Sequence, residues 1–500
     1  MDTSDTATAG AGSIEERIWP VVIIGTGFGG QATAVNLLRR DIDDFLMLER
    51  RDFMGGTWQQ NSYPGAAVDV QSPLYSLSFE PWPWTQMFAE REELAEYTAH
   101  VIDKYGLREK TRLSHNVEQV AWQEDEGVWY IQVADRPTIR ARVLINASGP
   151  LSTPVIPNFP GRERFKGESF HTNDWNHDFD HRGKRLAIIG SGASAAQIIP
   201  AIAPDVAELH VFQRSPHWVI PRPDRKFGAL TRRLLSIKPV YKAVRTAIYW
   251  GLESRIIGFK YSRTMLNLIA QRKADKHLEE QVPDEALRAR LTPDFTIGCK
   301  RIILSNTLYP ALMRDNVTLH DAQDGIEEVT ETGIRTKQGE AIDLDCIVWS
   351  TGYDATDGMI SYPVIGRHGK TLADFWADYP RAYLGTAIPG FPNLFIGTGP
   401  NTGIGHTSHI FMIESQLKYI IQCVEKVLKS DAGQIEVTPE AEARYTAKIH
   451  DEMAQTVWHT GGCNSWYKSA SGRVTAMFPG FTFTYRRMAE NFKRDDHRLV

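Results

Sequence analysis

Residues 20–30 have the sequence PVVIIGTGFGG, in which a short apolar run leads directly into a glycine-rich turn. β-branched residues dominate the run, which predicts a buried parallel strand. The residues after the turn, 31–40, favour a helix, and a second apolar strand is expected over 45–48. Strand, turn, helix and strand in this order predict a βαβ unit, with the pattern G-x-G-x-x-G at its turn.

Each glycine of this turn has a physical role in binding a dinucleotide. Gly25 permits the tight turn, Gly27 lets the backbone approach a pyrophosphate, and Gly30 lets helix and strand pack closely. Free N–H groups at the N-terminus of the helix favour the same anion. Glu49 lies 24 residues after Gly25, where a carboxylate can accept hydrogen bonds from ribose hydroxyls. This first unit therefore predicts a site for FAD or NAD.

A second unit of the same kind lies farther along the chain. Residues 184–189 predict its strand and 196–201 its helix, and the turn between them has the form G-x-G-x-x-A. Arg214 stands 24 residues after the first glycine of this turn, where the first unit has an acid. Because a guanidinium pairs with a ribose 2′-phosphate, this unit predicts NADPH. The residues expected to contact it in the turn are Gly190, Gly192 and Ser194.

Two nucleotide sites in one chain indicate hydride transfer from NADPH to a flavin. The four cysteines, Cys299, Cys346, Cys423 and Cys463, include no C-x-x-C pair, which argues against a redox dithiol and against a zinc site. So few cysteines predict no disulfide framework and favour the reducing cytoplasm. Oxygen activation by the reduced flavin is then the leading alternative to disulfide reduction.

Composition and charge exclude several other classes. The 500 residues carry 56 Lys and Arg against 61 Asp and Glu, a formal charge of −5, so no basic excess favours nucleic acid. Residues 1–17 lack the features of a secretory signal and predict a disordered tail. The longest apolar candidate, 240–270, carries six charged residues, so no integral membrane segment is expected. The oligomeric state stays open between monomer and homodimer.

The sequence between the two units resembles the fingerprint of type I Baeyer–Villiger monooxygenases, which are class B flavoproteins of the flavin-containing monooxygenase superfamily. That fingerprint is F-x-G-x-x-x-H-x-x-x-W followed by Pro or Asp, and here Asn176 stands at the last position. The related N- and S-monooxygenases carry Tyr or Phe at the tryptophan position, so Trp175 favours Baeyer–Villiger chemistry. The matching residues, expected to have a structural role in the linkage between domains, are Phe165, Gly167, His171 and Trp175.

Further stretches resemble this family from about residue 19 to 490. They are GGTW at 55–58, YPGAAVD at 63–69 (with Ala67 where many members have Arg), GCKR at 298–301, WSTGY at 349–353, GPN at 399–401 and SWY at 465–467. The resemblance implies further cofactor contacts, which we expect from Gly56, Thr57, Trp58, Asp69, Tyr75, Lys300, Asn401 and Trp466.

The fold implied is α/β, with two Rossmann-like domains and a helical insertion. The FAD-binding domain is expected over 18–152 and 384–500, and the NADP-binding domain over 153–222 and 297–383. The insertion, 223–296, is dense in Lys, Arg and Leu at helical spacing. In the family such an insertion lies near the substrate entrance. A solvated lid without a direct role and an amphipathic surface that contacts a membrane are the alternatives.

The resemblance also implies a reaction. Reduced FAD adds O2 to form a C4a-peroxyflavin, whose peroxide anion attacks a ketone and yields an ester or lactone. Arg301 matches the arginine that stabilises the anionic oxygen, and Asp69 matches the acid that orients it. Lys300 is expected to point away from Arg301 and to help Arg214 hold the 2′-phosphate, since neighbours in an extended segment alternate faces.

Other interpretations remain at this stage. Arg301 could be a phosphate-binding or surface arginine, and Asp69 could cap the turn that follows 63–65. Trp466 could cap bound NADP⁺ or pack in the core. At the level of function, the chain could be a flavin-dependent N- or S-monooxygenase, which would not need Arg301 for migration. A nucleotide-binding redox sensor without turnover is a third class, against which the presence of both Asp69 and Arg301 argues.

Overall fold

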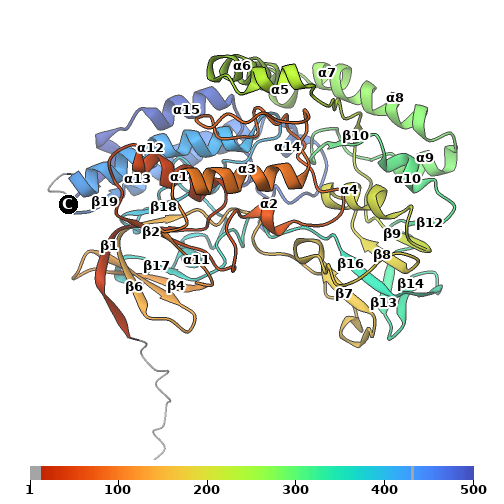
Figure 1. Ribbon diagram of the computed structural model, residues 1–500, viewed down its shortest axis with the longest axis horizontal. Helices are drawn as coiled ribbons and strands as arrows, with labels where there is room; N and C mark the ends of the chain where they lie inside the picture. Colours follow the sequence, from red (N-terminus) through yellow and green to blue (C-terminus); the bar gives the residue numbers. More distant parts are fainter. Residues whose placement is uncertain (1–12, 430–432) are drawn as a thin grey trace, which may run out of the picture.

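A computed structural model describes residues 13–429 and 433–500, and its two largest β-sheets lie side by side under a layer of helices (Figure 1). The predicted α/β class is confirmed. The predicted tail falls partly outside the described residues. Its last part is wrong, because residues from Ile14 onward belong to β1 (Ile14–Ile24). They extend that strand since Ile14 and Ile18 pair with β6 (Thr138–Asn146).

The first sheet is built around the first glycine turn. Its strand order is β17-β4-β5-β6-β1-β2-β3, with β18 also paired to β6. β1 lies between β2 and β6 in parallel, and α1 follows the turn, so the predicted βαβ unit is confirmed. The bounds are β2 (Phe45–Leu48), β3 (Thr111–Arg112), β4 (Val117–Gln123), β5 (Val128–Val133), β17 (Val364–Ile365), β18 (Leu394–Ile396) and α1 (Phe28–Leu38).

Helices cover one face of the first sheet and bury its apolar side chains. The core beneath them joins residues of β1, α1, α3 and α12, among them Val21, Ala34, Tyr97 and Tyr419, all almost fully buried. These helices and the smaller elements around them are α2 (Thr57–Gln60), α3 (Arg91–Lys104), α11 (Leu372–Phe375), α12 (His409–Lys429), α13 (Pro439–Met453), α14 (Val457–Thr460), α15 (Thr482–Glu490), β19 (Ile435–Val437) and β20 (His497–Leu499).

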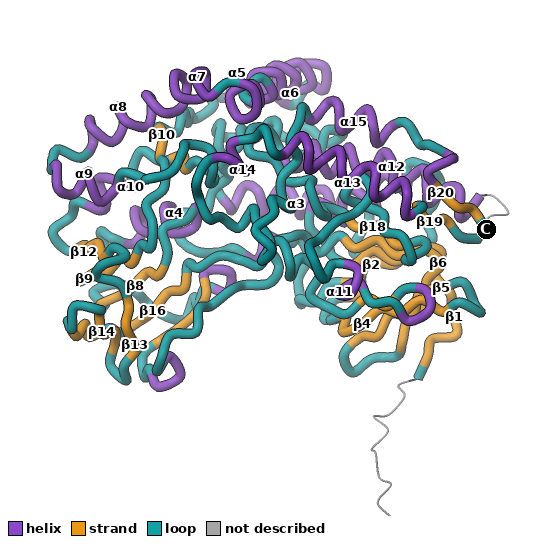
Figure 2. The backbone as a smooth tube through the Cα atoms, turned by 180° about the vertical axis from the view of Figure 1, so that it is seen from behind, coloured by secondary structure: helices purple, strands orange, loops and turns teal. Residues whose placement is uncertain are grey.

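The second sheet is entirely parallel and is built around the second glycine turn. Its order is β12-β9-β8-β16-β7, and α4 follows β8 as predicted. An antiparallel three-stranded sheet, β13-β14-β15, lies beside it (Figure 2). The bounds are β7 (Glu168–His171), β8 (Arg185–Ile189), β9 (Glu208–Phe212), β12 (Val317–His320), β13 (Ile326–Val329), β14 (Gly333–Thr336), β15 (Ala341–Asp343), β16 (Cys346–Trp349), α4 (Ala193–Ile202) and α10 (Leu308–Leu312).

The segment 223–296 holds helices, which run along one edge of the molecule in both ribbon views (Figures 1 and 2). They are α5 (Ala229–Leu235), α6 (Lys238–Glu253), the π-helical turns η3 (Ile257–Tyr261) and η4 (Asn267–Gln271), α7 (Arg263–Leu266), α8 (Arg272–Gln281) and α9 (Glu285–Leu291). Among the described residues, no helix combines the length and the apolar character that a membrane span requires.

Candidate active site

A cleft opens at the first glycine turn, between β1, α1 and the segment around residue 148. Predicted FAD contacts from separate parts of the chain meet on its wall. Those that line it are Gly25, Gly27, Glu49, Gly56, Thr57, Trp58 and Tyr75.

The three glycines of the turn differ in what surrounds them. Gly25 has a φ of +103°, and a Cβ there would lie 2.6 Å from the carbonyl oxygen of Ala147. A Cβ on Gly30 would lie 2.0 Å from the carbonyl oxygen of Gly25, which explains the close packing of helix on strand. A Cβ on Gly27 would meet no atom closer than 3.6 Å. The space at Gly27 is therefore open, as close approach of a ligand requires.

Glu49 is buried at the end of β2 and is held in place by Thr26. The Thr26 hydroxyl donates to Glu49 Oε2 at 2.6 Å, and the Thr26 backbone N–H donates to the same oxygen at 3.2 Å. Thr26 was not predicted as a functional residue, although it lies within the G-x-G motif. Its bonds fix the carboxylate at the edge of the cleft, where a ribose would lie.

The cleft wall also contains buried polar atoms that fit a polar cofactor. Five of them have no hydrogen-bond partner among the described residues: Gln60 Nε2, Ser148 Oγ, Ser152 Oγ, Thr398 Oγ1 and His409 Nε2. Burial of unpartnered polar groups costs free energy, so a ligand that bonds to them is stabilised. Burial, and to a smaller extent the charge of Arg301, lowers the pKa of His409 to about 4, so this imidazole is neutral near pH 7. These donors and acceptors fit FAD.

Arg301 and Asp69 form a close ion pair between the two halves of the molecule. Arg301 Nε donates to Asp69 Oδ2 at 2.7 Å, and Nη2 contacts the same oxygen. Asp69 raises the pKa of the guanidinium above its ordinary value. The Arg301 side chain remains 44% exposed, so the remaining N–H groups can reach a ligand. The predicted pairing of these two residues is thereby confirmed, and the rival interpretation of Asp69 as only a turn cap is not needed.

Lys300 points away from Arg301, as the alternation of an extended segment predicts. Its Nζ donates to Ser215 Oγ at 2.8 Å, beside Arg214. Burial, and secondly the charge of Arg214, lowers the pKa of Lys300. Arg214 is exposed and has no carboxylate partner in the described part of the chain. Two neighbouring cations, neither of which forms an ion pair among the described residues, make a site that fits a phosphate.

The turn beside Arg214 has the same geometry as the first one. Gly190 has a φ of +126°, and a Cβ there would lie 2.2 Å from the carbonyl oxygen of Ser350. Gly192 precedes α4 and has no atom within 4 Å of an added Cβ, which leaves room for a pyrophosphate. Ser194 lies in the first turn of α4 and its side chain interacts with Tyr63. Gly190, Gly192 and Ser194 thus lie at one turn, and their contact with NADPH stays a prediction.

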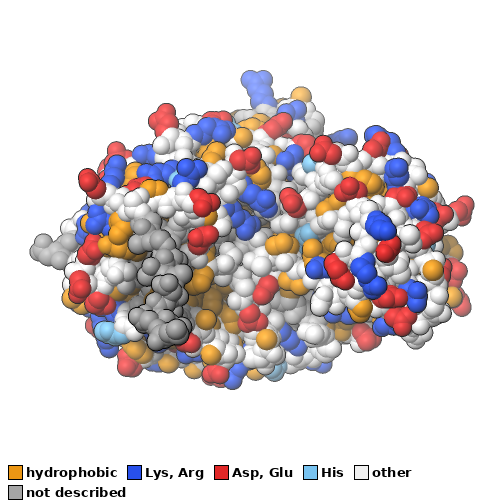
Figure 3. All heavy atoms as spheres, turned by 90° about the horizontal axis from the view of Figure 1, so that it is seen from below, with side chains coloured by type: hydrophobic (Ala, Val, Ile, Leu, Met, Phe, Trp, Pro, Cys, Tyr) orange, Lys and Arg blue, Asp and Glu red, His pale blue; other side chains and the backbone are white. Residues whose placement is uncertain are grey.

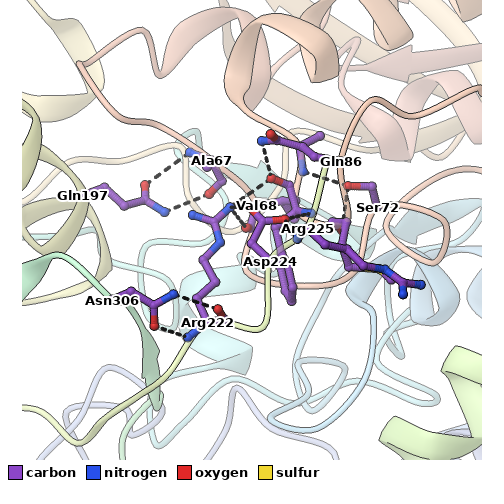
Figure 4. A network of polar contacts seen from close by, with 12 residues as sticks. Ala67, Val68, Ser72, Gln86, Gln197, Arg222, Asp224, Arg225 and Asn306 are labelled. Carbon is purple, nitrogen blue, oxygen red and sulfur yellow. Dashed lines mark hydrogen bonds and ion pairs between the residues drawn. The ribbon is translucent and has the colours of Figure 1, made fainter. Parts of the chain in front are cut away.

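Arg222 fixes the backbone next to Asp69, and its role was not predicted (Figure 4). Its Nη2 donates to the carbonyl oxygens of Val68 and Phe88, at 3.3 and 3.0 Å. Asn306 holds the Arg222 main chain by two hydrogen bonds, from its Nδ2 to the carbonyl oxygen and from the backbone N–H to its Oδ1. Sequence offers no motif for Arg222, because its partners are main-chain atoms more than 130 residues away.

Gln197 of α4 also binds the main chain of the loop that carries Asp69. It does so at Ala67, one residue before Val68. Its Nε2 donates to the carbonyl oxygen of Ala67 at 2.8 Å, and its Oε1 accepts from the Ala67 N–H at 3.4 Å (Figure 4). The two side chains come from the part of the chain that holds the second glycine turn. The loop that carries Asp69 is therefore positioned from the NADP side.

The fingerprint residues serve packing around β7. Trp175 is buried against Phe170, with ring centroids 5.1 Å apart. His171 ends β7, and its Nδ1 accepts from the N–H of Asn173 at 3.1 Å. A Cβ on Gly167 would lie 2.5 Å from the ring of Phe165. No acid–base contact joins His171 to Trp175 among the described residues, in line with the structural role predicted for them.

Asn401 and Trp466, both predicted to contact a cofactor, do not line the FAD cleft. Asn401 is buried, and its Nδ2 donates to the carbonyl oxygens of Val474 and Met477 at 3.2 and 3.0 Å. Its amide holds the C-terminal loop, and its contact with a cofactor stays a prediction. Trp466 lies on that loop, 43% exposed and packed against Tyr467. Its proposed contact with NADP⁺ stays a prediction.

Cys299 and Cys463 form a disulfide, although so few cysteines predicted no disulfide framework. The fold brings these cysteines together although 164 residues separate them, which no local spacing could reveal. The bond joins the residue before Lys300 to the loop that carries Trp466. Cys346 and Cys423 are free and buried.

Comparison with known proteins agrees with this geometry. Residues 19–373 match the flavin-binding monooxygenase-like family. A Baeyer–Villiger monooxygenase of Pseudomonas aeruginosa is 42% identical over 483 residues, covering 96% of this chain and 91% of the relative.

Two solved structures superpose over almost the whole chain. An oxidised steroid monooxygenase bound to NADP has a TM-score of 0.85 and 30% identity, and covers 97% of this chain and 100% of its own. OTEMO in complex with FAD and NADP has a TM-score of 0.86 and 25% identity, with the same coverage. The chain therefore belongs to the flavin-binding monooxygenase-like family and, within it, to the Baeyer–Villiger monooxygenases.

Proposed function

We propose that this enzyme inserts one oxygen atom from O2 into a ketone, to give an ester or lactone, at the Arg301–Asp69 pair. FAD and NADPH are its cofactors, and reduced FAD supplies the oxygen-activating chemistry. The observation that carries the proposal is a half-exposed guanidinium, fixed by a carboxylate, near the open flavin cleft. Arg301 would stabilise the negative charge that develops on oxygen in the transition state. Asp69 would hold the guanidinium in that position.

A product analysis on paired substrates tests this function. The holoenzyme is given NADPH, O2 and either an apolar ketone or a sulfide of similar size. We expect an ester or lactone heavier than the ketone by one oxygen atom, formed in step with NADPH consumption. Efficient sulfoxide formation without any ester would contradict the proposal and favour an S-monooxygenase. The ketone series should include cyclic and steroid ketones, because one structural relative is a steroid monooxygenase.

Arg214 is expected to set the preference for NADPH. Replacing it with alanine removes a charge-assisted bond to the 2′-phosphate, which typically contributes about 1.5–3 kcal/mol. The affinity for NADPH should therefore fall roughly tenfold or more, whereas the affinity for NADH should hardly change. Stopped-flow reduction of the flavin at varied concentrations of NADPH and of NADH measures both affinities. Equal losses for the two nucleotides would show that Arg214 does not contact the phosphate.

Arg222 is expected to act as a positioning residue for Asp69. Arg222→Ala removes the bonds to Val68 and Phe88, so we expect ester yield per NADPH to fall by about tenfold while KM for NADPH is kept. Arg222→Lys should restore part of the yield. Arg225→Ala is the control, because Arg225 is an exposed neighbour whose side chain stacks near Phe227. Loss of FAD or of thermal stability in parallel with the yield would mean that Arg222 is only structural.

The proposal extends to the compartment and the oligomeric state of the enzyme. The dependence on NADPH favours the cytoplasm as the compartment, although protein disulfides such as Cys299–Cys463 are uncommon there. Free thiols are blocked with an alkylating agent in intact cells, and the protein is then mapped by non-reducing peptide analysis. This measurement establishes whether the disulfide forms inside the cell. The working assembly is a monomer or a homodimer, which sedimentation distinguishes.

A further inference from the structure

The helical edge formed by residues 229–273 exposes large apolar side chains to solvent. We call this surface the α5–α8 face, and it includes Phe483 of the adjacent α15. Leu230 is 72% exposed, Ile269 59% and Trp250 53%. The other exposed apolar side chains of the face are Leu234, Ile237, Tyr261, Met265, Leu268 and Phe483. More than half of the exposed large apolar side chains of the described residues therefore gather here, which marks an interaction surface.

The same face carries exposed positive charge that no ion pair neutralises in the described part of the chain. Residues 229–273 contain ten Lys and Arg but one acid, Glu253, in a chain of net charge −5. Glu253 is buried, where it accepts hydrogen bonds from the N–H and hydroxyl of Thr482. Eight of the cations are exposed, and none of these forms an ion pair within the described ranges: Arg232, Arg233, Lys238, Lys242, Arg255, Arg263, Arg272 and Lys273.

The face on the other side of the molecule differs in its charge pattern. Figures 1 and 2 place α5 to α8 along one edge, above the two sheets. The view from below shows acidic and basic side chains interspersed (Figure 3). Mixed signs are usual on the surface of a freely diffusing protein, whereas aromatic and aliphatic side chains among unpaired cations are typical of a surface that meets anionic lipid.

We propose that the α5–α8 face binds the surface of a membrane that contains anionic lipid. Its Leu, Ile, Trp and Phe side chains would enter the boundary between headgroups and acyl chains, and its Lys and Arg side chains would contact the lipid phosphates. A second copy of this chain fits less well, because a two-fold interface would bring the same unpaired cations together. Nucleic acid is also a poorer partner, because its binding to the cations would leave the aliphatic side chains of the face exposed to water.

Buried polar contacts hold this face rigidly on the catalytic part of the molecule. Arg245 of α6 donates to the carbonyl oxygens of Pro73, Leu74 and Ser76 at 3.1, 2.9 and 2.7 Å. Its Nη2 also pairs with Glu414 of α12 at 3.2 Å. Residues 73–76 include Tyr75, which lines the flavin cleft. A membrane bound at this face would therefore lie at a fixed position relative to the active site, close to a source of apolar substrates.

Sedimentation with vesicles tests the proposal on the holoenzyme. The vesicles consist of phosphatidylcholine alone, or of phosphatidylcholine with about one third phosphatidylglycerol. We expect binding only to the second kind, weakened by high salt because exposed charges are screened. Arg272→Glu with Lys273→Glu should lower the partition coefficient about tenfold or more, since each cation near an anionic surface contributes about 1 kcal/mol. The double substitution Leu268→Ser with Ile269→Ser should lower the partition coefficient to a similar extent.

Matched substitutions outside the face provide the control. Met313→Ser and Lys184→Glu also change an exposed apolar and an exposed basic residue, and should leave vesicle binding unchanged. All these variants should keep wild-type flavin content and NADPH oxidation with a water-soluble ketone. Absence of wild-type binding, or equal losses in the controls, would overturn the proposal. So would a dimer that the Leu268 and Ile269 substitutions dissociate without any vesicle binding, because the face would then join two copies.

Discussion

Replacing Arg301 with alanine is expected to lower ester formation by about 10²- to 10³-fold, the effect of removing one preorganised donor to a developing oxyanion. The guanidinium is held by Asp69 and needs no reorganisation during the reaction. FAD should stay bound, since its predicted contacts around Gly25 and Glu49 lie elsewhere. NADPH should still reduce the flavin, and hydrogen peroxide should be released in place of product.

Three measurements on one preparation of Arg301→Ala separate these effects: stopped-flow flavin reduction, peroxide yield and ester yield. Lys300→Ala is the matched control, because the neighbouring side chain faces Ser215 and Arg214. That control should weaken NADPH binding but keep the yield of ester per NADPH. An unchanged ester yield in Arg301→Ala would show that this arginine has no part in the oxygen transfer.

Gly27→Val is expected to abolish retention of FAD while the chain still folds. An added Cβ meets no atom closer than 3.6 Å, so the protein without flavin can accept it, but the side chain would fill the space needed by the pyrophosphate. Losing two charge-assisted hydrogen bonds, at about 1.5–3 kcal/mol each, corresponds to roughly 10²- to 10⁴-fold in affinity. Flavin absorbance after reconstitution measures the loss, and circular dichroism checks the fold.

Gly192→Val is a matched control for this prediction. Gly192 precedes α4 as Gly27 precedes α1, both with extended φ and ψ, and it also has free space at its Cβ position. The variant should keep FAD and lose affinity for NADPH. If Gly27→Val retained flavin at the wild-type level, the first glycine turn would not be the site of the FAD pyrophosphate.

The sequence predicted the elements whose residues are close together in the chain. The strand, turn and helix at Gly25 and at Gly190 are confirmed, because glycine spacing and short apolar runs are local signals. The family, the reaction class and both cofactors are also confirmed by the comparisons, which favour them over an N- or S-monooxygenase. The pairing of Asp69 with Arg301 was predicted only from the resemblance to the family. The two residues are 232 positions apart, so no local pattern in the sequence connects them.

What the sequence missed depends on contacts made by main-chain atoms or by distant side chains. Arg222 binds carbonyl oxygens, which every residue has, so its partners leave no pattern in the sequence. Asn401 lies in a family-like segment, yet its amide binds the C-terminal loop. The pairing of Cys299 with Cys463 and the start of β1 at Ile14 likewise depend on partners that only the folded chain brings near.

The pairing of β18 with β6 has a consequence for the order of events on the ribosome. β6 ends at residue 146, but its partner Leu394–Ile396 is translated about 250 residues later. Every strand of the second sheet lies between these two points in the chain. The second sheet can therefore complete its pairing during synthesis, while the C-terminal end of β6 in the first sheet still lacks its partner β18. An unpaired strand edge is prone to aggregation, so chains that terminate before residue 394 should be found with chaperones or in the insoluble fraction.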